Sequence, residues 1–146
     1  MRLILTAAAL SVAAACSGPT VSTETPTAVQ TVTAPSEDAR FIAVMSYADW
    51  CGSCKALDPK VKAVQTANTF DGVEFFTLDY TARDDEAFFE GAATLGVEDT
   101  LRETFSDKIK TGKLYLIERE TGMIVSTIDK SMSEADITQA IESATA

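Results

Sequence analysis

Apolar and polar residues follow one another in blocks along this chain, and the blocks predict its strands. Residues 41–47 (FIAVMSY) and 73–80 (VEFFTLDY) are nearly continuous apolar runs, typical of strands that helices cover on both faces. Residues 113–118 (KLYLIE) and 123–128 (MIVSTI) predict two more strands. The four residues between them, Arg-Glu-Thr-Gly, suit a tight hairpin.

Helical spacing of apolar residues predicts helices between and after these strands. In residues 54–67 the apolar positions form one stripe, and Pro59 is expected to kink the helix. The acidic residues 84–86 precede a second helix at 87–97 and favour its positive N-terminal end. A short helix is expected at 100–105, and Ser133 caps a closing helix at 134–143. The order β-α-β-α-β-β-α predicts an α/β fold with a mixed central sheet.

The N-terminal residues have the pattern of a targeting signal. Residues 1–15 contain one basic residue, an apolar run and small residues that lead into Cys16. Small residues before a cysteine resemble a bacterial lipobox, which implies that Cys16 is lipidated and becomes the mature N-terminus. The alternative is an ordinary signal peptide with an incidental thiol at Cys16. The sequence therefore predicts a protein of the cell envelope, on the periplasmic side, held to a membrane through Cys16.

Residues 16–37 have the composition of a tether between this anchor and the compact domain at 38–146. Residues 17–36 hold three of the four prolines and six threonines, with no aromatic residue and one charge. Such a segment buries too little apolar surface to offset the entropy lost on ordering. A weaker alternative is an edge strand through Val29 and Val32.

The charge balance narrows the range of partners. The chain has 12 basic and 22 acidic residues, a net charge of -10. A chain this acidic repels phosphate backbones, so no nucleic-acid partner is expected. It has no histidine and three cysteines, so the ligands for a zinc site are lacking. No metal or cofactor is expected.

The main chemical candidate is the pair Cys51 and Cys54 within ADWCGSCKALDP, residues 48–59. Two residues between cysteines at a helix start permit a disulfide. At the helix N-terminus Cys51 meets unpaired N–H groups and the positive end of the helix dipole, which lower a thiol pKa. Cys54 lies one turn into the helix. The spacing therefore predicts Cys51 as nucleophile and Cys54 as the resolving thiol.

The sequence Trp-Cys-x-x-Cys-Lys between a strand and a helix, with a proline five residues after the second cysteine, resembles thioredoxin. The resemblance covers about residues 40–146 and implies a thioredoxin-like fold and thiol–disulfide exchange. It also implies supporting positions around the pair: an exposed apolar platform at Trp50, a positive charge at Lys55, and the residues Gly52, Ser53 and Pro59. Ser53 stands where thioredoxin itself has proline.

Four departures from the family pattern accompany this resemblance. Met45 and Phe75 occupy the places of a buried aspartate and its lysine partner, so an apolar pair is expected there. Thr111 and Gly112 stand where the family has a cis-proline facing the disulfide, at the substrate-docking edge. Residues 98–110 are an addition, expected as a surface elaboration or as a helical flap beside the site.

Three functions are compatible with the pair. The first is a membrane-tethered thiol–disulfide oxidoreductase, acting on protein thiols and disulfides with an envelope electron donor or acceptor. The second is a Cu(I)-binding module, since two soft sulfurs suffice for linear coordination. The third is a non-catalytic partner-binding domain in which the disulfide only fastens a turn. A loop this short contributes little entropic stabilisation, which favours the first function.

Overall fold

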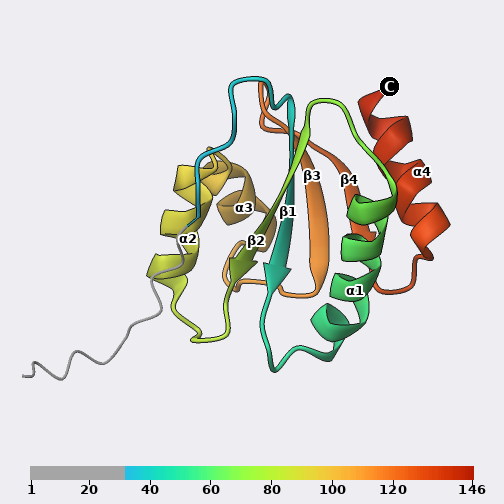
Figure 1. The fold of residues 1–146 in the computed structure, drawn as a ribbon. Coiled ribbons are helices and arrows are strands. Elements are labelled where there is room, and N and C mark those ends of the chain that lie inside the picture. The colour runs from blue at the N-terminus through green and yellow to red at the C-terminus, as the bar shows by residue number, and fades with distance from the viewer. Residues whose placement is uncertain (1–31) are drawn as a thin grey trace, which may run out of the picture.

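The structure, a computed structural model, describes residues 32–146. The signal at residues 1–15, Cys16 and residues 17–31 of the expected tether lie outside the described residues. Strands and helices follow one another nearly as the apolar blocks predict, and the chain has a thioredoxin-like α/β fold (Figure 1). The elements are β1 (Phe41–Tyr47), α1 (Gly52–Ala67), β2 (Val73–Asp79), α2 (Asp85–Thr94), α3 (Glu98–Phe105), β3 (Lys113–Glu118), β4 (Ile124–Asp129) and α4 (Glu134–Thr145).

The four strands form one mixed sheet in the order β2-β1-β3-β4. β1 pairs with β2 in parallel, and α1 crosses between them, as parallel neighbours require. β3 runs antiparallel to β1 and forms the predicted hairpin with β4. This topology brings the end of β1, the start of β3 and the end of β4 to one edge of the sheet, where α1 begins.

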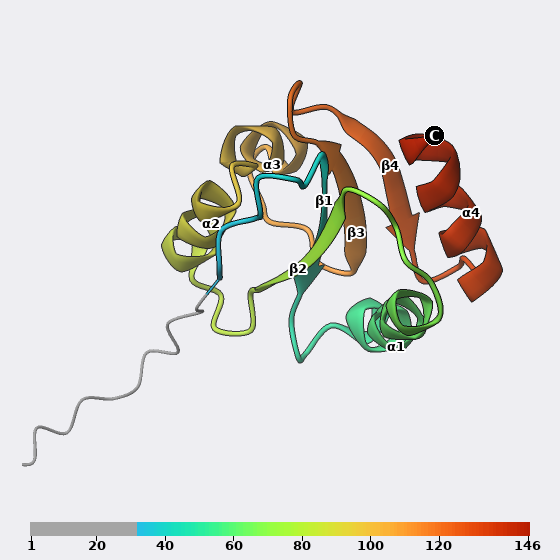
Figure 2. The same cartoon turned by 45° about the horizontal axis from the view of Figure 1, so that its top comes forward.

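Helices cover both faces of the sheet, with α2 and α3 on one side and α1 and α4 on the other (Figure 2). Successive residues of β1 point to opposite faces, so Ile42 and Val44 enter the core under α2 and α3 while Ala43 and Met45 enter the core under α1 and α4. Both faces of β1 are therefore shielded from solvent, which explains its continuous apolar run.

The closing helix α4 begins with the predicted cap. The Ser133 hydroxyl accepts the Asp136 amide hydrogen at 3.2 Å, and the Asp136 carboxylate accepts the Ser133 amide hydrogen at 3.0 Å. This reciprocal pair satisfies two amide groups that the helix itself leaves without partners. The Ser133 hydroxyl also donates to the Asp136 carboxylate at 2.7 Å, and this bond, followed by the bond from the Ser133 amide, holds the pKa of Asp136 below its usual value.

The additional segment 98–110 is not a surface elaboration, because part of it is buried in the core. Helix α3 buries Leu101 and Phe105 completely or nearly so, and Ile109 is 6% exposed. The Phe105 ring lies 6.0 Å from the Phe88 ring and 5.7 Å from the Tyr115 ring. The expectation of a surface segment is wrong because the pattern Leu101–Phe105 is one apolar face of a helix, and this face completes the core beside α2.

Contacts with the domain begin within the segment predicted as a tether. Val32 is partly buried against the core under α2. The Ser36 amide donates to the Glu74 carboxylate at 3.1 Å, and Arg119 donates to the Ser36 carbonyl at 2.7 Å. The hydroxyl and amide of Ser36 hold the pKa of Glu74 below its usual value. These bonds fasten residues 32–40 to the sheet before β1 begins.

If α3 is part of the core, Phe105→Ala should lower the free energy of unfolding by about 3–5 kcal/mol, the usual cost of emptying a buried aromatic site. Glu103→Ala on the exposed face of the same helix should change it by less than about 0.5 kcal/mol. Denaturant unfolding of both variants checks this. Equal, small effects would show that α3 does not contribute to the core.

Candidate active site

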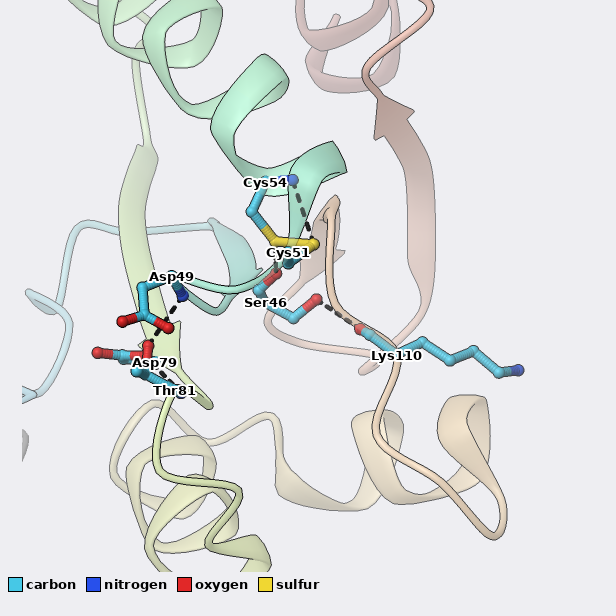
Figure 3. The surroundings of a disulfide bond; sticks show 7 residues. All are labelled: Ser46, Asp49, Cys51, Cys54, Asp79, Thr81 and Lys110. Atoms are coloured by element: carbon cyan, nitrogen blue, oxygen red, sulfur yellow. Dashed lines mark hydrogen bonds between the residues drawn. A yellow bond between two sulfur atoms is a disulfide. The ribbon is translucent and has the colours of Figure 1, made fainter.

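The cysteine pair lies where β1 ends and α1 begins. Cys51 and Cys54 form a disulfide, with Cα atoms 5.3 Å apart (Figure 3). The turn before the helix is fixed by a hydrogen bond from the Cys51 amide to the Ala48 carbonyl at 3.1 Å. The local sequence therefore delivers both sulfurs to the sheet edge where β3 starts and β4 ends.

Cys51 is the N-cap residue of α1. Its backbone is extended, with φ -90° and ψ 108°, and its Sγ atom accepts the Cys54 amide hydrogen at 3.2 Å. Amide groups in the first turn of a helix have no carbonyl partner, and they carry the positive end of the helix dipole. The first turn of α1 contains no acidic residue to oppose this field. The position thus favours a thiolate at Cys51 once the disulfide is reduced.

Cys54 is the inner sulfur. It is fully buried, whereas Cys51 is 9% exposed. The Cys54 Sγ atom lies 3.7 Å from the Ser46 carbonyl oxygen of β1. A carbonyl oxygen beside a sulfur disfavours the thiolate and favours the thiol, which can donate a hydrogen bond to it. The two cysteines therefore meet opposite environments, and only Cys51 is reachable from outside.

Ser46 connects the disulfide to the segment before β3, and sequence reasoning missed it. It is fully buried, and its hydroxyl donates to the Lys110 carbonyl at 2.7 Å (Figure 3). Its carbonyl oxygen accepts the Gly112 amide hydrogen at 2.8 Å. A buried hydroxyl needs such a partner to offset its desolvation. The sequence did contain a sign of this residue, because Ser46 is a polar residue within the apolar run 41–47.

Gly112, one of the two residues of the predicted docking edge, lies close to the disulfide. Its φ is +90°, in the region that favours glycine. A Cβ atom at this position would lie 2.7 Å from the Ser53 Cβ and 3.3 Å from the Cys51 Sγ. Only glycine permits this approach of the backbone. The preceding residue, Thr111, is half-exposed beside it.

Trp50 forms an exposed platform next to Cys51, with 44% of its surface accessible. Its Nε1 atom donates to the Thr81 carbonyl at 3.1 Å, which fixes the ring. The Arg83 guanidinium lies 4.3 Å from the centre of the ring, and the Tyr80 ring meets it edge-on at 6.3 Å. The sequence indicated Trp50 but not the β2–α2 residues that hold it.

The other predicted positions have simpler environments. Gly52 has open space where a side chain would lie, and Ser53 packs its Cβ towards Gly112. Lys55 is exposed on the first turns of α1. Helix α1 continues through Pro59 to Ala67, although a proline offers no N–H to the carbonyl of Lys55.

Met45 and Phe75 share the core under α1 and α4, Met45 fully and Phe75 partly buried. They are not register partners, because Met45 lies opposite Thr77 and Phe75 opposite Ala43. Both line a small cleft of about 110 Å³ that opens at the β2 edge. Apolar side chains thus stand at the positions where the resemblance led us to expect them.

The described part of the chain contains no group of three or more cysteine, histidine or carboxylate side chains arranged to hold a metal. Within residues 32–146, no helix has both the length and the apolar character needed to cross a bilayer.

The sequence was compared with protein families and with known proteins. The thioredoxin family model matches residues 23–92, which include β1, the cysteine pair, α1 and β2. The matched residues include both Cys51 and Cys54. No curated protein matches the sequence significantly.

Several solved structures are similar to this chain at low sequence identity. Thioredoxin-2, a component of malaria parasite protein secretion machinery, is 15% identical, with a TM-score of 0.50 over 77% of this chain and 93% of that one. StoA from Bacillus subtilis is 17% identical over 73% and 84% of the two chains, with a TM-score of 0.49. A thioredoxin from Halobacterium salinarum is 20% identical over 75% and 78%, with a TM-score of 0.46.

The close approach of Gly112 predicts a specific sensitivity. Gly112→Ala places a Cβ atom 2.7 Å from the Ser53 Cβ at a φ that L-residues rarely adopt. We expect a loss of about 1–3 kcal/mol in the free energy of unfolding of the oxidised protein. Gly52→Ala is the matched control, because nothing lies within 4 Å of its Cβ position, and it should cost no stability. Tolerance of Gly112→Ala in denaturant unfolding would show that the backbone does not approach the disulfide this closely.

Proposed function

We propose that this chain is a thiol–disulfide oxidoreductase acting on protein thiols and disulfides through Cys51 and Cys54. The observation that carries the proposal is the position of the Cys51 sulfur: it caps helix α1 and accepts the Cys54 amide hydrogen at 3.2 Å. A purely structural disulfide needs neither the positive field of a helix N-terminus at one sulfur nor an exposed tryptophan ring beside it. The thioredoxin family match over residues 23–92 supports the same chemistry.

The reaction proceeds in two exchanges. In the reduced chain, the Cys51 thiolate attacks one sulfur of a client disulfide, forms a mixed disulfide and releases the other client sulfur as a thiolate. The Cys54 thiol then loses its proton and attacks the Cys51 sulfur, which closes the Cys51–Cys54 bond and releases the second client thiolate. The client gains two electrons and the chain loses two. In the opposite direction a client dithiol reduces the Cys51–Cys54 bond by the same steps.

Two surfaces beside Cys51 suit a client in extended conformation. Trp50 offers an apolar face that Tyr80, Thr81 and Arg83 hold in place. On the other side Gly112 leaves the disulfide uncovered by any side chain of its own. The Ser46 bonds to Lys110 and Gly112 keep this edge at a fixed distance from the sulfurs. A fixed edge lowers the entropy lost when a client docks.

Alkylation and single-turnover kinetics test the proposal. The full chain is used with Cys16→Ser, so that Cys51 and Cys54 are its only thiols. After reduction, Cys51 should be alkylated at a lower pH than free cysteine, because the helix N-terminus stabilises its thiolate. Cys51→Ser should abolish reduction of a neutral disulfide. Cys54→Ser should accumulate the mixed disulfide, detected by mass spectrometry.

The control for this experiment is Ser53→Ala, which changes the residue between the cysteines without removing a sulfur and should retain turnover. If the reduced chain exchanges no disulfide and its Cys51 titrates like free cysteine, the oxidoreductase proposal is wrong. Stable uptake of one Cu(I) per reduced chain, without disulfide exchange, would instead support the copper-binding alternative.

We also propose that the protein works at the cell envelope, on the periplasmic side, held to a membrane by a lipid on Cys16. The support is the sequence of residues 1–16 and the threonine- and proline-rich segment that follows. In bacterial cells, the wild-type chain should fractionate with membranes and incorporate labelled fatty acid. Cys16→Ser should lose the label and appear in the soluble periplasmic fraction. Unlabelled wild-type protein in that fraction would show that the signal is cut without lipidation.

A further inference from the structure

Positive charge is distributed unevenly over this acidic chain. All seven lysines fall in residues 55–62, residues 108–113 and position 130. These stretches are far apart in sequence, but the topology brings them together, because α1 begins, β3 begins and β4 ends at the edge of the sheet that carries the disulfide. A chain with a net charge of -10 thus has a locally positive surface beside its reactive sulfurs.

Five of these lysines form what we call the lysine rim: Lys55, Lys108, Lys110, Lys113 and Lys130, all of them exposed. Lys113 is the register partner of Ser46 and follows Gly112 directly, so it lies next to the docking edge. The Lys110 side chain extends from its backbone bond with Ser46 away from the disulfide (Figure 3). The other two lysines lie further along α1, where Lys60 donates to the Lys130 carbonyl at 2.8 Å and Lys62 pairs with Asp58.

Three carboxylates lie in or directly beside these stretches: Asp58, which pairs with Lys62, and Asp107 and Asp129. Asp129 is the register partner of Lys113 and accepts hydrogen bonds from Ser131. These hydrogen bonds, followed by the charges of Lys113 and Lys130, hold the pKa of Asp129 below its usual value. The three stretches hold seven lysines against these three carboxylates, so this side of the site remains positive.

The side of the site that carries Trp50 has the opposite charge. Five carboxylates lie at the β1–α1 turn, at the end of β2 and at the start of α2, and together we call them the acidic rim: Asp49, Asp79, Asp84, Asp85 and Glu86. Arg83, over the Trp50 ring, is the single cation among them. The Asp49 amide donates to the Thr81 hydroxyl at 3.0 Å, and the Thr81 amide donates to Asp79 at 2.7 Å, which holds this turn together (Figure 3).

We propose that the lysine rim selects client proteins in which acidic residues flank the reacting cysteine on one side only. This inference rests on the proposed function and adds the client's charge to it. The net negative charge of the chain repels an anionic client, whereas the lysine rim attracts and orients it. When acidic residues lie on both sides of the client cysteine, those on one side face the acidic rim. Their repulsion then offsets the attraction of the others to the lysine rim.

Single-turnover kinetics with defined peptides test this selection. The reduced full chain with Cys16→Ser is mixed with single-cysteine peptides held as mixed disulfides with 2-mercaptoethanol, and oxidation is followed by the fluorescence of Trp50, the chain's one tryptophan. Each turnover converts the peptide disulfide into two thiols and the two protein thiols into the Cys51–Cys54 bond. Three peptides carry glutamates: two before the cysteine, two after it, or two on each side. The comparison peptides carry two lysines or two serines in their place.

At low salt, one of the two peptides with glutamates on a single side should react about tenfold faster than the serine peptide, the scale of electrostatic steering. The peptide with glutamates on both sides should be slower than the preferred one. Two lysines on the preferred side meet the lysine rim, so that peptide should react more slowly than the serine peptide. The advantage should disappear at 1 M salt, where the Debye length falls to about 3 Å.

Two charge variants separate steering from folding. Lys113→Gln with Lys130→Gln removes two charges of the lysine rim and should lower the rate for the preferred peptide about three- to tenfold, while the serine peptide reacts as before. Arg40→Gln with Arg102→Gln removes two charges away from this edge and should leave the preference intact. Equal rates for all peptides, or an equal loss for the serine peptide, would overturn the inference.

The outcomes distinguish this inference from the proposed function. If the serine peptide itself is not reduced, the oxidoreductase proposal fails. If the serine peptide is reduced but the charge of the peptide has no effect on the rate, only the proposed selection by the lysine rim fails. Binding to phosphatidylglycerol vesicles, absent with phosphatidylcholine and lost in Lys113→Gln with Lys130→Gln, together with no preference among peptides, would assign the lysines to a membrane surface and overturn the inference.

Discussion

The chemistry proposed for this protein depends on one hydrogen bond, from the Cys54 amide to the Cys51 sulfur. It makes a cysteine side chain the cap of helix α1, a place that oxygen-bearing side chains usually take. Because the bond points an unpaired helix amide at the sulfur, the same contact that starts the helix also stabilises negative charge on the nucleophile. Folding and reactivity are joined at this atom, and the sheet supplies the rest of the environment through Ser46.

Ser46 and Gly112 together hold the proposed docking edge without a proline. The backbone of residues 110–112 is drawn towards the disulfide by two bonds to one strand residue, a hydroxyl to the Lys110 carbonyl and a carbonyl to the Gly112 amide. The approach is possible because glycine has no side chain to place between the segment and the sulfurs. A proline ring, which fixes φ, is one way to hold such an edge. Here the hydroxyl and the carbonyl of the buried Ser46 hold it instead.

The core on the α2 side is larger than the family pattern led us to expect. Helix α3 brings Leu101 and Phe105 into contact with Phe88 and Tyr115, and the segment that follows it ends at Lys110, beside the disulfide. The additional residues therefore stabilise the α2 face and also position the edge at which β3 begins. The same topology gathers lysines from three separate stretches at one side of the site and carboxylates at the other.

The sequence by itself determined the order of elements, the place of the cysteines and the capping of α1 and α4. These features depend on residues near one another in the chain: apolar runs, helical stripes, Ser133 three residues before Asp136, and Cys51 three residues before Cys54. Tertiary structure decided which residues far apart would meet. The contact of Ser46 with Lys110, the approach of Gly112 to Cys51, and the placing of Arg83 over Trp50 join residues separated by more than thirty positions. Local patterns contain no information about such pairs, because they arise only when the strands align and the helices pack.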